Sequence, residues 1–448
     1  MVYIKMPEDV RDIIDRLNLH GFEAFIVGGC VRDSLLKKTP NDWDITTNAK
    51  PKDIIKIFEK TVPTGIKHGT VTVLIKTNSY EVTTYRIDGE YTDKRRPDSV
   101  EFSNDIVEDL KRRDFTINSI AYNGDKGLVD PFNGYIDIIN KQIKCVGKAN
   151  DRFEEDALRM LRAVRFSSQL NFEIVKDTYT SIKNKAHLIK EVSNERIQVE
   201  LNKILISDST KIKLLKDTGL LYFIMPEICE LDEVEQNTPY HKYNVLEHTL
   251  FAVDAIENKL VLKLAMLLHD TGKAVSKTTD KRGIDHFYGH AKASVNISRE
   301  ILNRLKYDNN TKRKIVTLVA YHDCKLLPDK VSIKKLLNKL GNVELLRDLL
   351  KIKWADTLAK NPKYIKSRIL ELIDIERILE DILENQECFC IKDLAINGSD
   401  LTEIGYKGKE IGTILNRLLE MVIQDPELND KKELIYNVRN KTKKMNLL

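Results

Sequence analysis

Long hydrophobic runs are missing from this sequence, and aromatic side chains make up only 7% of its 448 residues. Apolar runs such as Leu264 to Leu268 are much shorter than the roughly 20 residues that cross a bilayer. The first residues also lack the apolar segment of a signal peptide. We therefore expect a cytoplasmic protein with no membrane role.

Cysteine is scarce as well: six residues are scattered along the chain, and Cys388 and Cys390 lack a second pair to complete a zinc site. This pattern favours reduced thiols over a disulfide framework. The net charge of +5 is small beside 73 basic and 68 acidic side chains. The overall charge therefore does not indicate a nucleic-acid partner, and only local basic clusters can do so.

Helix and strand patterns divide the chain into an N-terminal α/β part and a longer, all-helical remainder. A polar, proline-containing stretch over residues 231–243 is typical of a linker. We predict an α+β chain whose head (1–145) contains a mixed β-sheet. Three helical parts follow it: a neck (146–230), a central domain (240–360) and a tail (361–448).

The most informative stretch begins with a glycine pair. Gly28 and Gly29 follow a short apolar run, and Arg32 comes three residues later. Glycines let backbone N–H groups approach a polyphosphate, and the arginine fork donates to phosphate oxygens. Asp42 and Asp44 are predicted to lie in a strand and share one of its faces, where paired carboxylates favour magnesium. These residues predict a metal-held nucleoside triphosphate; the alternative is an ordinary strand, turn and helix with aspartate caps.

A predicted hairpin follows the two aspartates. Its strands cover residues 69–75 and 80–86, and Glu81 shares a face with Thr83 and Tyr85. If the hairpin packs beside the aspartates, Glu81 becomes a third carboxylate of the site; otherwise it is an exposed strand residue. The charged residues 88–99 are predicted to form a surface loop.

A second informative stretch, residues 152–166, is predicted to form one amphipathic helix. Asp156, Arg159 and Arg162 recur at helical spacing, with Arg165 at the edge of the same face. A carboxylate accepts from the amino group of cytosine or adenine, while a guanidinium donates to the neighbouring ring nitrogen. Guanine and uracil present a carbonyl there, so an Asp–Arg pair can select C and A. The alternative is a solvated charged face.

Histidine and aspartate residues recur along the predicted central helices. They are His248, the adjacent pair His269 and Asp270, His290, His322 and Asp356. Imidazole and carboxylate groups on neighbouring helices suit a metal site. Their order resembles the all-helical HD phosphohydrolase family. The resemblance implies four metal ligands: His248, His269, Asp270 and Asp356. It also implies that His290 and His322 are secondary ligands or phosphate contacts; the alternative is a retained fold without activity.

The first 205 or so residues carry an ordered series of motifs. They are Gly28-Gly29-x-Val31-Arg32-Asp33, Asp42-Trp43-Asp44-Ile45, Thr64-Gly65-x-x-His68-Gly69-Thr70-Val71, Glu81-Val82-Thr83-Thr84-Tyr85-Arg86, Arg112-Arg113-Asp114-Phe115-Thr116-x-Asn118 and Glu155-Asp156-Ala157-Leu158-Arg159. In this order they resemble the tRNA nucleotidyltransferases, the CCA-adding enzymes of the bacterial class II type. The resemblance implies a catalytic head, a neck that binds the nucleotide base and RNA, and a tail that binds the tRNA acceptor arm.

The same resemblance implies roles for individual residues. Asp42 and Asp44 would bind two magnesium ions, and Glu81 is our candidate for a third catalytic acid. The implied nucleotide-binding residues are Gly28, Gly29, Arg32, Arg113, Asp156, Arg159, Arg162 and Arg165. Asp156 and Arg159 would read C and then A without a nucleic-acid template.

The implied reaction is addition of CCA to tRNA 3′ ends from CTP and ATP, with release of pyrophosphate. A second divalent metal at the HD-like site would add a phosphohydrolase activity for 3′ end repair. In the family, the loop that corresponds to residues 88–99 helps the enzyme to change from adding C to adding A. Its presence therefore favours complete CCA addition. The alternatives are an A-adding enzyme, a poly(A) polymerase, or an HD phosphohydrolase with a nucleotide-binding head.

Overall fold

The structure, a computed structural model, describes residues 2–89 and 99–445. The chain divides into two compact units, residues 1–229 and residues 230–448. Residues 90–98 of the predicted surface loop lie outside the described residues. Within the described ranges, no helix has the length and apolar character that crossing a membrane requires. All six cysteines are free thiols, as predicted. The division into head, neck, central domain and tail stays a prediction.

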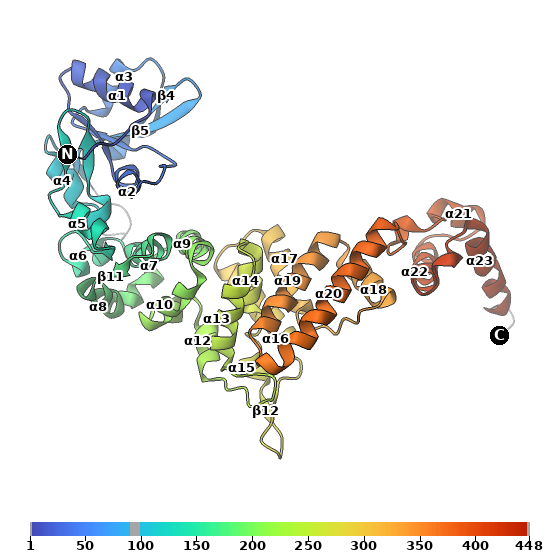
Figure 1. The fold of residues 1–448 in the computed structure, drawn as a ribbon. Coiled ribbons are helices and arrows are strands. Elements are labelled where there is room, and N and C mark those ends of the chain that lie inside the picture. The colour runs from blue at the N-terminus through green and yellow to red at the C-terminus, as the bar shows by residue number, and fades with distance from the viewer. Residues whose placement is uncertain (1, 90–98, 446–448) are drawn as a thin grey trace. The chain divides into compact units, whose positions relative to one another are not determined.

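A seven-stranded mixed sheet organises the first unit (Figure 1). The strands, in spatial order, are β3 (Thr61–Gly65), β4 (Thr70–Ile75), β5 (Asn78–Thr84), β2 (Ile45–Thr47), β1 (Ala24–Val27), β8 (Ala121–Asn123) and β9 (Gly127–Val129). Within this sheet, β2 and β5 are the parallel pair, with Ile45 opposite Val82, and the other neighbouring strands are antiparallel. Because this register extends back by one residue, Asp44 and Glu81 occupy neighbouring positions at the edge of the pairing.

Helices pack against the sheet and create its core. Apolar residues at helical spacing over 8–19 predict a helix, and Pro51 predicts the start of another. The structure confirms both: α1 (Glu8–Leu19) buries its apolar stripe, and α3 (Pro51–Ile57) begins with the proline at its first helical position. Side chains alternate along a strand, so Phe25 and Val27 share one face of β1. They pack there with Leu110 of α4 (Ile106–Lys111).

The prediction that Asp42 and Asp44 lie within a strand is wrong. β2 begins only at Ile45, and the two aspartates lie in the segment that leads into it. The Asp44 carbonyl still accepts from the N–H of Val27 at 3.0 Å. Because β1 ends there, at the turn of Gly28 (φ 79°), the residues before Asp44 have no strand to pair with.

The predicted hairpin of β4 and β5 is confirmed, with Lys76 in its tight turn at φ 54°. The expectation that its second strand continues to residue 86 is wrong. β5 ends at Thr84, and Arg86 instead begins β6 (Arg86–Asp88), which pairs with β7 (Val100–Phe102).

The prediction of one helix over residues 152–166 is also wrong. The chain forms α6 (Ala149–Glu155) and α7 (Leu158–Leu170), separated at Asp156, whose φ and ψ are −146° and 103°. Asp156 Oδ1 accepts from the N–H of Leu158 at 3.1 Å. An aspartate that satisfies a backbone donor in this way competes with continuous helix and starts a new one. α7 packs along α9 (Asn194–Ser207), and Leu158, Leu161 and Val164 are buried.

The second unit is helical over most of its length, as predicted (Figure 1). The helices of its larger part are α13 (Val245–Ala255), α14 (Leu260–Leu268), α15 (Lys273–Ser276), α16 (His290–Arg304), α17 (Asn309–Tyr321), α18 (Lys330–Leu340), α19 (Val343–Leu358) and α20 (Pro362–Glu384). A separate apolar cluster joins α21 (Gly398–Glu403), α22 (Lys409–Gln424) and α23 (Lys431–Met445) near the C-terminus.

Candidate active site

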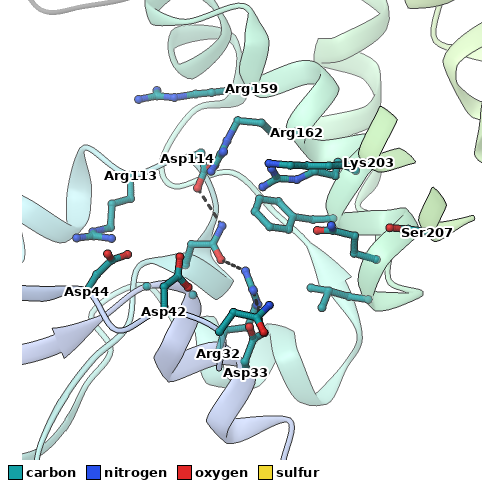
Figure 2. A pocket seen from close by; sticks show the side chains of 18 of the residues that line it. Arg32, Asp33, Asp42, Asp44, Arg113, Asp114, Arg159, Arg162, Lys203 and Ser207 are labelled. Atoms are coloured by element: carbon teal, nitrogen blue, oxygen red, sulfur yellow. Dashed lines mark hydrogen bonds and ion pairs between the residues drawn. The ribbon is translucent and has the colours of Figure 1, made fainter. Parts of the chain in front are cut away.

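A cavity of about 950 Å³ in the first unit is lined by all eight residues predicted to bind nucleotide (Figure 2). Its walls come from the glycine turn, the aspartate segment, the residues after α4, and helices α7 and α9. The predicted residues that line it are Gly28, Gly29, Arg32, Asp42, Asp44, Arg113, Asp156, Arg159, Arg162 and Arg165. Glu81 does not line this cavity.

The two aspartates lie at one end of the cavity, with Arg113 beside Asp44 (Figure 2). Asp44 is open to the cavity but surrounded by protein atoms. This desolvation, followed by the negative charge of Asp42, raises the pKa of the Asp44 carboxyl to about 6, and Glu81 adds to the shift. Arg113 opposes it. Two hard oxygen donors that repel each other in this way fit a divalent cation between them.

The glycine turn is shaped by its close approach to Arg113. Gly28 has φ 79°, and a Cβ built on it would lie only 2.9 Å from Nη1 of Arg113. Asp109 orients Arg113: Asp109 Oδ2 accepts a hydrogen bond from Arg113 Nη2 at 3.2 Å. Its buried Nε makes no hydrogen bond within the described residues. Glycine at position 28 therefore allows this cation to reach the floor of the cavity.

A chain of polar contacts connects α7 to Arg32 beneath the cavity, as the dashed lines of Figure 2 indicate in part. Arg162 Nε donates to Asp114 Oδ2 at 2.7 Å, and Asn118 Nδ2 donates to Asp114 Oδ1 at 3.1 Å. Asn118 Oδ1 in turn accepts from Arg32 Nη1 at 2.6 Å. Burial opposes ionisation of Asp114, but Arg162 and Asn118 outweigh it and hold its pKa at about 2.

The predicted base-reading pair lies in the wall formed by the α6–α7 break, with each member held by other residues. Asp156 Oδ2 accepts from Arg196 Nη2 at 2.7 Å. Arg159 donates from Nη1 to Glu155 at 2.5 Å and from Nη2 to the carbonyl of Arg112 at 3.0 Å. Both side chains are thus oriented before any ligand arrives.

The remaining arginines of the cavity are engaged by the protein itself. Arg165 donates to Glu200 Oε1 at 3.0 Å and lies 4.3 Å from the ring centre of Phe166. Burial, with the neighbouring charge of Arg162, lowers the pKa of Arg165 to about 10. Arg162 and Arg165 therefore charge the wall, and each already donates to a carboxylate of the protein, Arg162 to Asp114 and Arg165 to Glu200.

Sequence reasoning missed several residues that hold this site together: Asp114, Asn118, Glu155, Arg196 and Glu200. Glu155 and Asp114 stand next to predicted residues, so adjacency in the chain was an available signal. Arg196 and Glu200 come from α9, about 40 positions away, and nothing in the pattern of residues 193–201 marks them as partners of α7.

The second unit brings together all six of its predicted histidine and aspartate residues. His248 Nε2 lies 3.0 Å from Asp356 Oδ1, and His269 Nε2 lies 3.0 Å from Asp270 Oδ2. Ligand atoms of His248, His269 and Asp356 lie within 4.8 Å of one another, and so do those of His269, Asp270 and His322. His290 completes the cluster, with Nε2 at 3.1 Å from that of His322 and 3.5 Å from Asp270 Oδ1.

The donors of this cluster fit a divalent metal. In the part of the chain that the structure describes, the buried atoms His269 Nε2 and Asp270 Oδ2 make no well-formed hydrogen bond. Burial opposes the charge on His269, but Asp270 and Asp356 overcome it and raise the pKa of His269 to about 9. Buried carboxylate and imidazole groups with unused ligand atoms are typical of transition-metal and zinc sites.

Three side chains around this cluster were not predicted. Lys273 Nζ lies 2.7 Å from Asp270 Oδ2, and Lys360 Nζ lies 2.7 Å from Asp356 Oδ2. Lys273 follows Asp270 by three residues across the turn that leads into α15, and Lys360 follows Asp356 by four residues, just beyond α19. These short spacings were the signal that could have found them. His241, whose ring lies edge-on to His248, precedes the helices and carried no such signal.

Comparison with known families assigns most of the chain. A family model described as the poly A polymerase head domain matches residues 24–144. A second, for a probable RNA and SrmB-binding site of polymerase A, matches residues 171–231. A third, a putative tRNA nucleotidyltransferase domain 2, matches residues 278–438.

Relatives extend this likeness over the full length. The CCA-adding enzyme of Ligilactobacillus salivarius is 34% identical over 444 residues, covering 98% of both chains. That of Geobacillus kaustophilus is 47% identical over 219 residues, which cover 48% of this chain and 54% of the relative. The Bacillus stearothermophilus CCA-adding enzyme, solved in complex with CTP, superposes with a TM-score of 0.73 at 30% identity, covering 99% of this chain and 100% of that one. An identity of 34% over 98% of both chains shows that this chain belongs to the CCA-adding enzymes, a family of nucleotidyltransferases.

Proposed function

We propose that this chain adds C, C and A to the 3′ ends of tRNA in the cytoplasm, taking the nucleotides from CTP and ATP and releasing pyrophosphate. The observation that carries the proposal is the content of one cavity. It contains paired aspartates, arginines suited to a triphosphate, and an Asp–Arg pair suited to a base edge. The free thiols of all six cysteines are consistent with a reducing compartment.

Asp42 and Asp44 would hold magnesium. When bound there, the metal would activate the terminal 3′-hydroxyl of the RNA and neutralise charge on the triphosphate. Arg32, fixed by Asp33 and Asn118, presents a cation beside the glycine turn, where triphosphate oxygens can approach the backbone. Arg113 limits the rise in the pKa of Asp44 and so favours the ionised carboxylate that can coordinate a metal. Glu81 contributes negative charge from the neighbouring strand and is not required to touch the nucleotide.

Base selection would follow from Asp156 and Arg159. The carboxylate accepts from the amino group that cytosine and adenine share, and the guanidinium donates to the ring nitrogen beside it. Uracil and guanine place a carbonyl oxygen against the carboxylate, which leaves a buried acceptor without a donor at a cost of about 1–3 kcal/mol. A fixed protein surface thus substitutes for a template strand.

The test uses tRNA transcripts that end before the CCA, after CC, or after CCA, each incubated with one labelled triphosphate and magnesium. The proposal predicts C and then C on the first transcript, A alone on the second, and nothing on the third. Incorporation of A only would identify an A-adding enzyme, and long runs of A would identify a poly(A) polymerase. Release of phosphate without incorporation would assign the main activity to the second unit.

A second candidate function, a metal-dependent phosphohydrolase, is favoured by the histidine–aspartate cluster of the second unit. His248, His269, Asp270 and Asp356 would hold a divalent metal, which when bound supplies an activated water and polarises a phosphoryl oxygen. His290 and His322 would be secondary ligands or phosphate contacts. A cavity of about 560 Å³ opens onto the cluster, and Lys273 and Lys360 line it as cations suited to phosphate.

This candidate is tested by metal content and by hydrolysis of RNA with 3′-phosphate or 2′,3′-cyclic phosphate ends. We expect the purified protein to retain a divalent metal in the second unit and to release or open these phosphates. The His269→Ala and Asp270→Ala variants should lose both the metal and the hydrolysis. Hydrolysis that survives in both variants would contradict the assignment.

A further inference from the structure

Asp156 is held on both sides of its carboxylate. Oδ1 accepts from the N–H of Leu158 at 3.1 Å, which ties the side chain to the start of α7. Oδ2 accepts from Arg196 Nη2 at 2.7 Å. Arg196 belongs to the first turn of α9, some 40 residues further along the chain, and it lines the same cavity. Among the described residues, Arg196 is the one side chain recorded in contact with this carboxylate.

These two contacts determine how the carboxylate faces the cavity. The Leu158 hydrogen bond restrains one oxygen of the carboxylate and by itself only weakly limits rotation about the Cβ–Cγ bond. The Arg196 hydrogen bond is charged and restrains the other oxygen, so the two contacts together fix the plane of the group. Each carboxylate oxygen has two lone pairs, so one acceptor position on each remains for a ligand.

Arg159, the other member of the pair, is fixed independently of Arg196. Glu155 and the carbonyls of Arg112 and Arg152 accept from its Nη atoms. Within the described residues, this leaves its Nε–H and one Nη2–H for a ligand. The relative placement of acceptor and donors at the base edge therefore depends on Arg196 for Asp156 and on Glu155 for Arg159.

We propose that Arg196 is a positioning residue that sets the base selectivity of this site by fixing the acceptor oxygens of Asp156. The inference rests on the proposed base-reading role of Asp156. Without the Arg196 contact, the carboxylate rotates among orientations that no longer match the amino group of cytosine or adenine. CTP and ATP then lose binding energy that UTP and GTP never had. The kcat/KM ratios of CTP to UTP and of ATP to GTP therefore fall.

The test measures kcat/KM for all four triphosphates with the full chain, on tRNA ending before CCA and on tRNA ending in CC. For Arg196→Gln we expect the preference for CTP over UTP, and for ATP over GTP, to fall about tenfold, as for loss of one charged hydrogen bond. The loss should appear mainly as a higher KM for CTP and ATP. Arg196→Lys should recover part of the preference, since an ammonium can donate to the same oxygen without the planar fork.

A double variant separates this inference from the proposed function. If Arg196 acts only through Asp156, adding Arg196→Gln to Asp156→Asn should not change the preference further. A preference unaltered in Asp156→Asn alone would instead overturn the base-reading role itself. Additive losses in the double variant would show that Arg196 acts on the substrate directly and would overturn the positioning role.

Lys185→Gln is the matched control, because Lys185 makes an ion pair with Glu154 of the same neck helices but does not line the cavity. We expect it to leave all four kcat/KM values unchanged. Equal loss for every triphosphate in both Arg196→Gln and Arg196→Lys, with the ratios intact, would assign Arg196 a purely structural role and contradict the proposal. If Arg196→Gln does not fold, Arg196→Lys, alone and combined with Asp156→Asn, still decides between these outcomes.

Discussion

The guanidinium of Arg162 donates to one oxygen of Asp114 through two nitrogens, at 2.7 Å from Nε and 2.6 Å from Nη2. Asp114 follows α4, and Arg162 lies in the middle of α7, so this contact joins the sheet-containing part of the first unit to its helices. The other oxygen of Asp114 accepts from Asn118, which contacts Arg32. The proposed phosphate end and the proposed base end of the cavity are thereby connected through a buried carboxylate.

The first prediction concerns stability and pH. Asp114 is buried and its pKa is held at about 2, below the ordinary value of 3.8, so its ionised form stabilises the folded state above pH 3.8. That stabilisation, about 2 kcal/mol for a shift of this size, disappears as the pH falls from 3.8 towards 2. Asp114→Asn should therefore lower the free energy of unfolding at pH 7, and the gap to the parent protein should narrow below pH 4.

Urea unfolding can be followed through Trp43 in a Trp354→Phe background, which leaves one tryptophan, in the first unit. Asp12→Asn is the control, because Asp12 lies in the same unit and its ion pair with Arg16 is exposed and contributes less than about 1 kcal/mol. A gap for Asp114→Asn that stays constant from pH 7 to pH 3 would contradict the role given to its charge.

The second prediction concerns the two acids proposed to bind metal, Asp42 and Asp44. Asp42→Ala or Asp44→Asn should reduce nucleotide addition by at least about a thousandfold, as expected when electrostatic stabilisation of the reacting phosphate is removed. The affinity for tRNA, measured by filter binding, should stay near that of the parent. Loss of tRNA binding in either variant would mean that the aspartate supports the fold instead.

The third prediction separates backbone strain from crowding at the glycine turn. Gly28→Ala and Gly21→Ala both place a side chain at positive φ and should each cost about 1 kcal/mol of stability. Only at position 28 does the new Cβ meet another group, Arg113 Nη1 at 2.9 Å; nothing lies within 4 Å at position 21. We expect KM for ATP to rise about tenfold, equal to 1.4 kcal/mol, in Gly28→Ala and not in Gly21→Ala. Equal KM values in the two variants would show that the approach of Arg113 does not matter for binding.

The fourth prediction is that the two sites act independently. The double variant His269→Ala, Asp270→Ala removes two of the proposed ligands in the second unit, whereas the nucleotide cavity is lined entirely by residues of the first. CCA addition at saturating tRNA should keep its parent rate, while bound metal, measured by elemental analysis, should fall. A collapse of CCA addition in a folded double variant would show that the sites are coupled.

The sequence predicted the elements whose patterns are local. The amphipathic α1, the proline-initiated α3 and the β4–β5 hairpin all carry their signals within a dozen residues, and the structure confirms them. The paired aspartates and the histidine–aspartate series could be found because carboxylate and imidazole side chains are the usual ligands of metal ions.

The misses came from interactions that residue spacing does not encode. Residues 152–166 are good helix formers throughout, yet Asp156 divides them by bonding to the backbone of Leu158 and to Arg196 of a distant helix. The extended segment at Asp42 lacks a strand partner because β1 turns away at Gly28. The proximity of Glu81 to Asp44 depends on the parallel pairing of β2 and β5, which no single stretch of residues specifies.

The walls of the nucleotide cavity come from positions as far apart as Gly28 and Ser207. The glycine turn and the segment of Asp42 and Asp44 are therefore synthesised long before α9, which forms the opposite wall of the cavity. Until the ribosome has translated nearly half of the message, the growing chain lacks the wall that α9 contributes to this cavity.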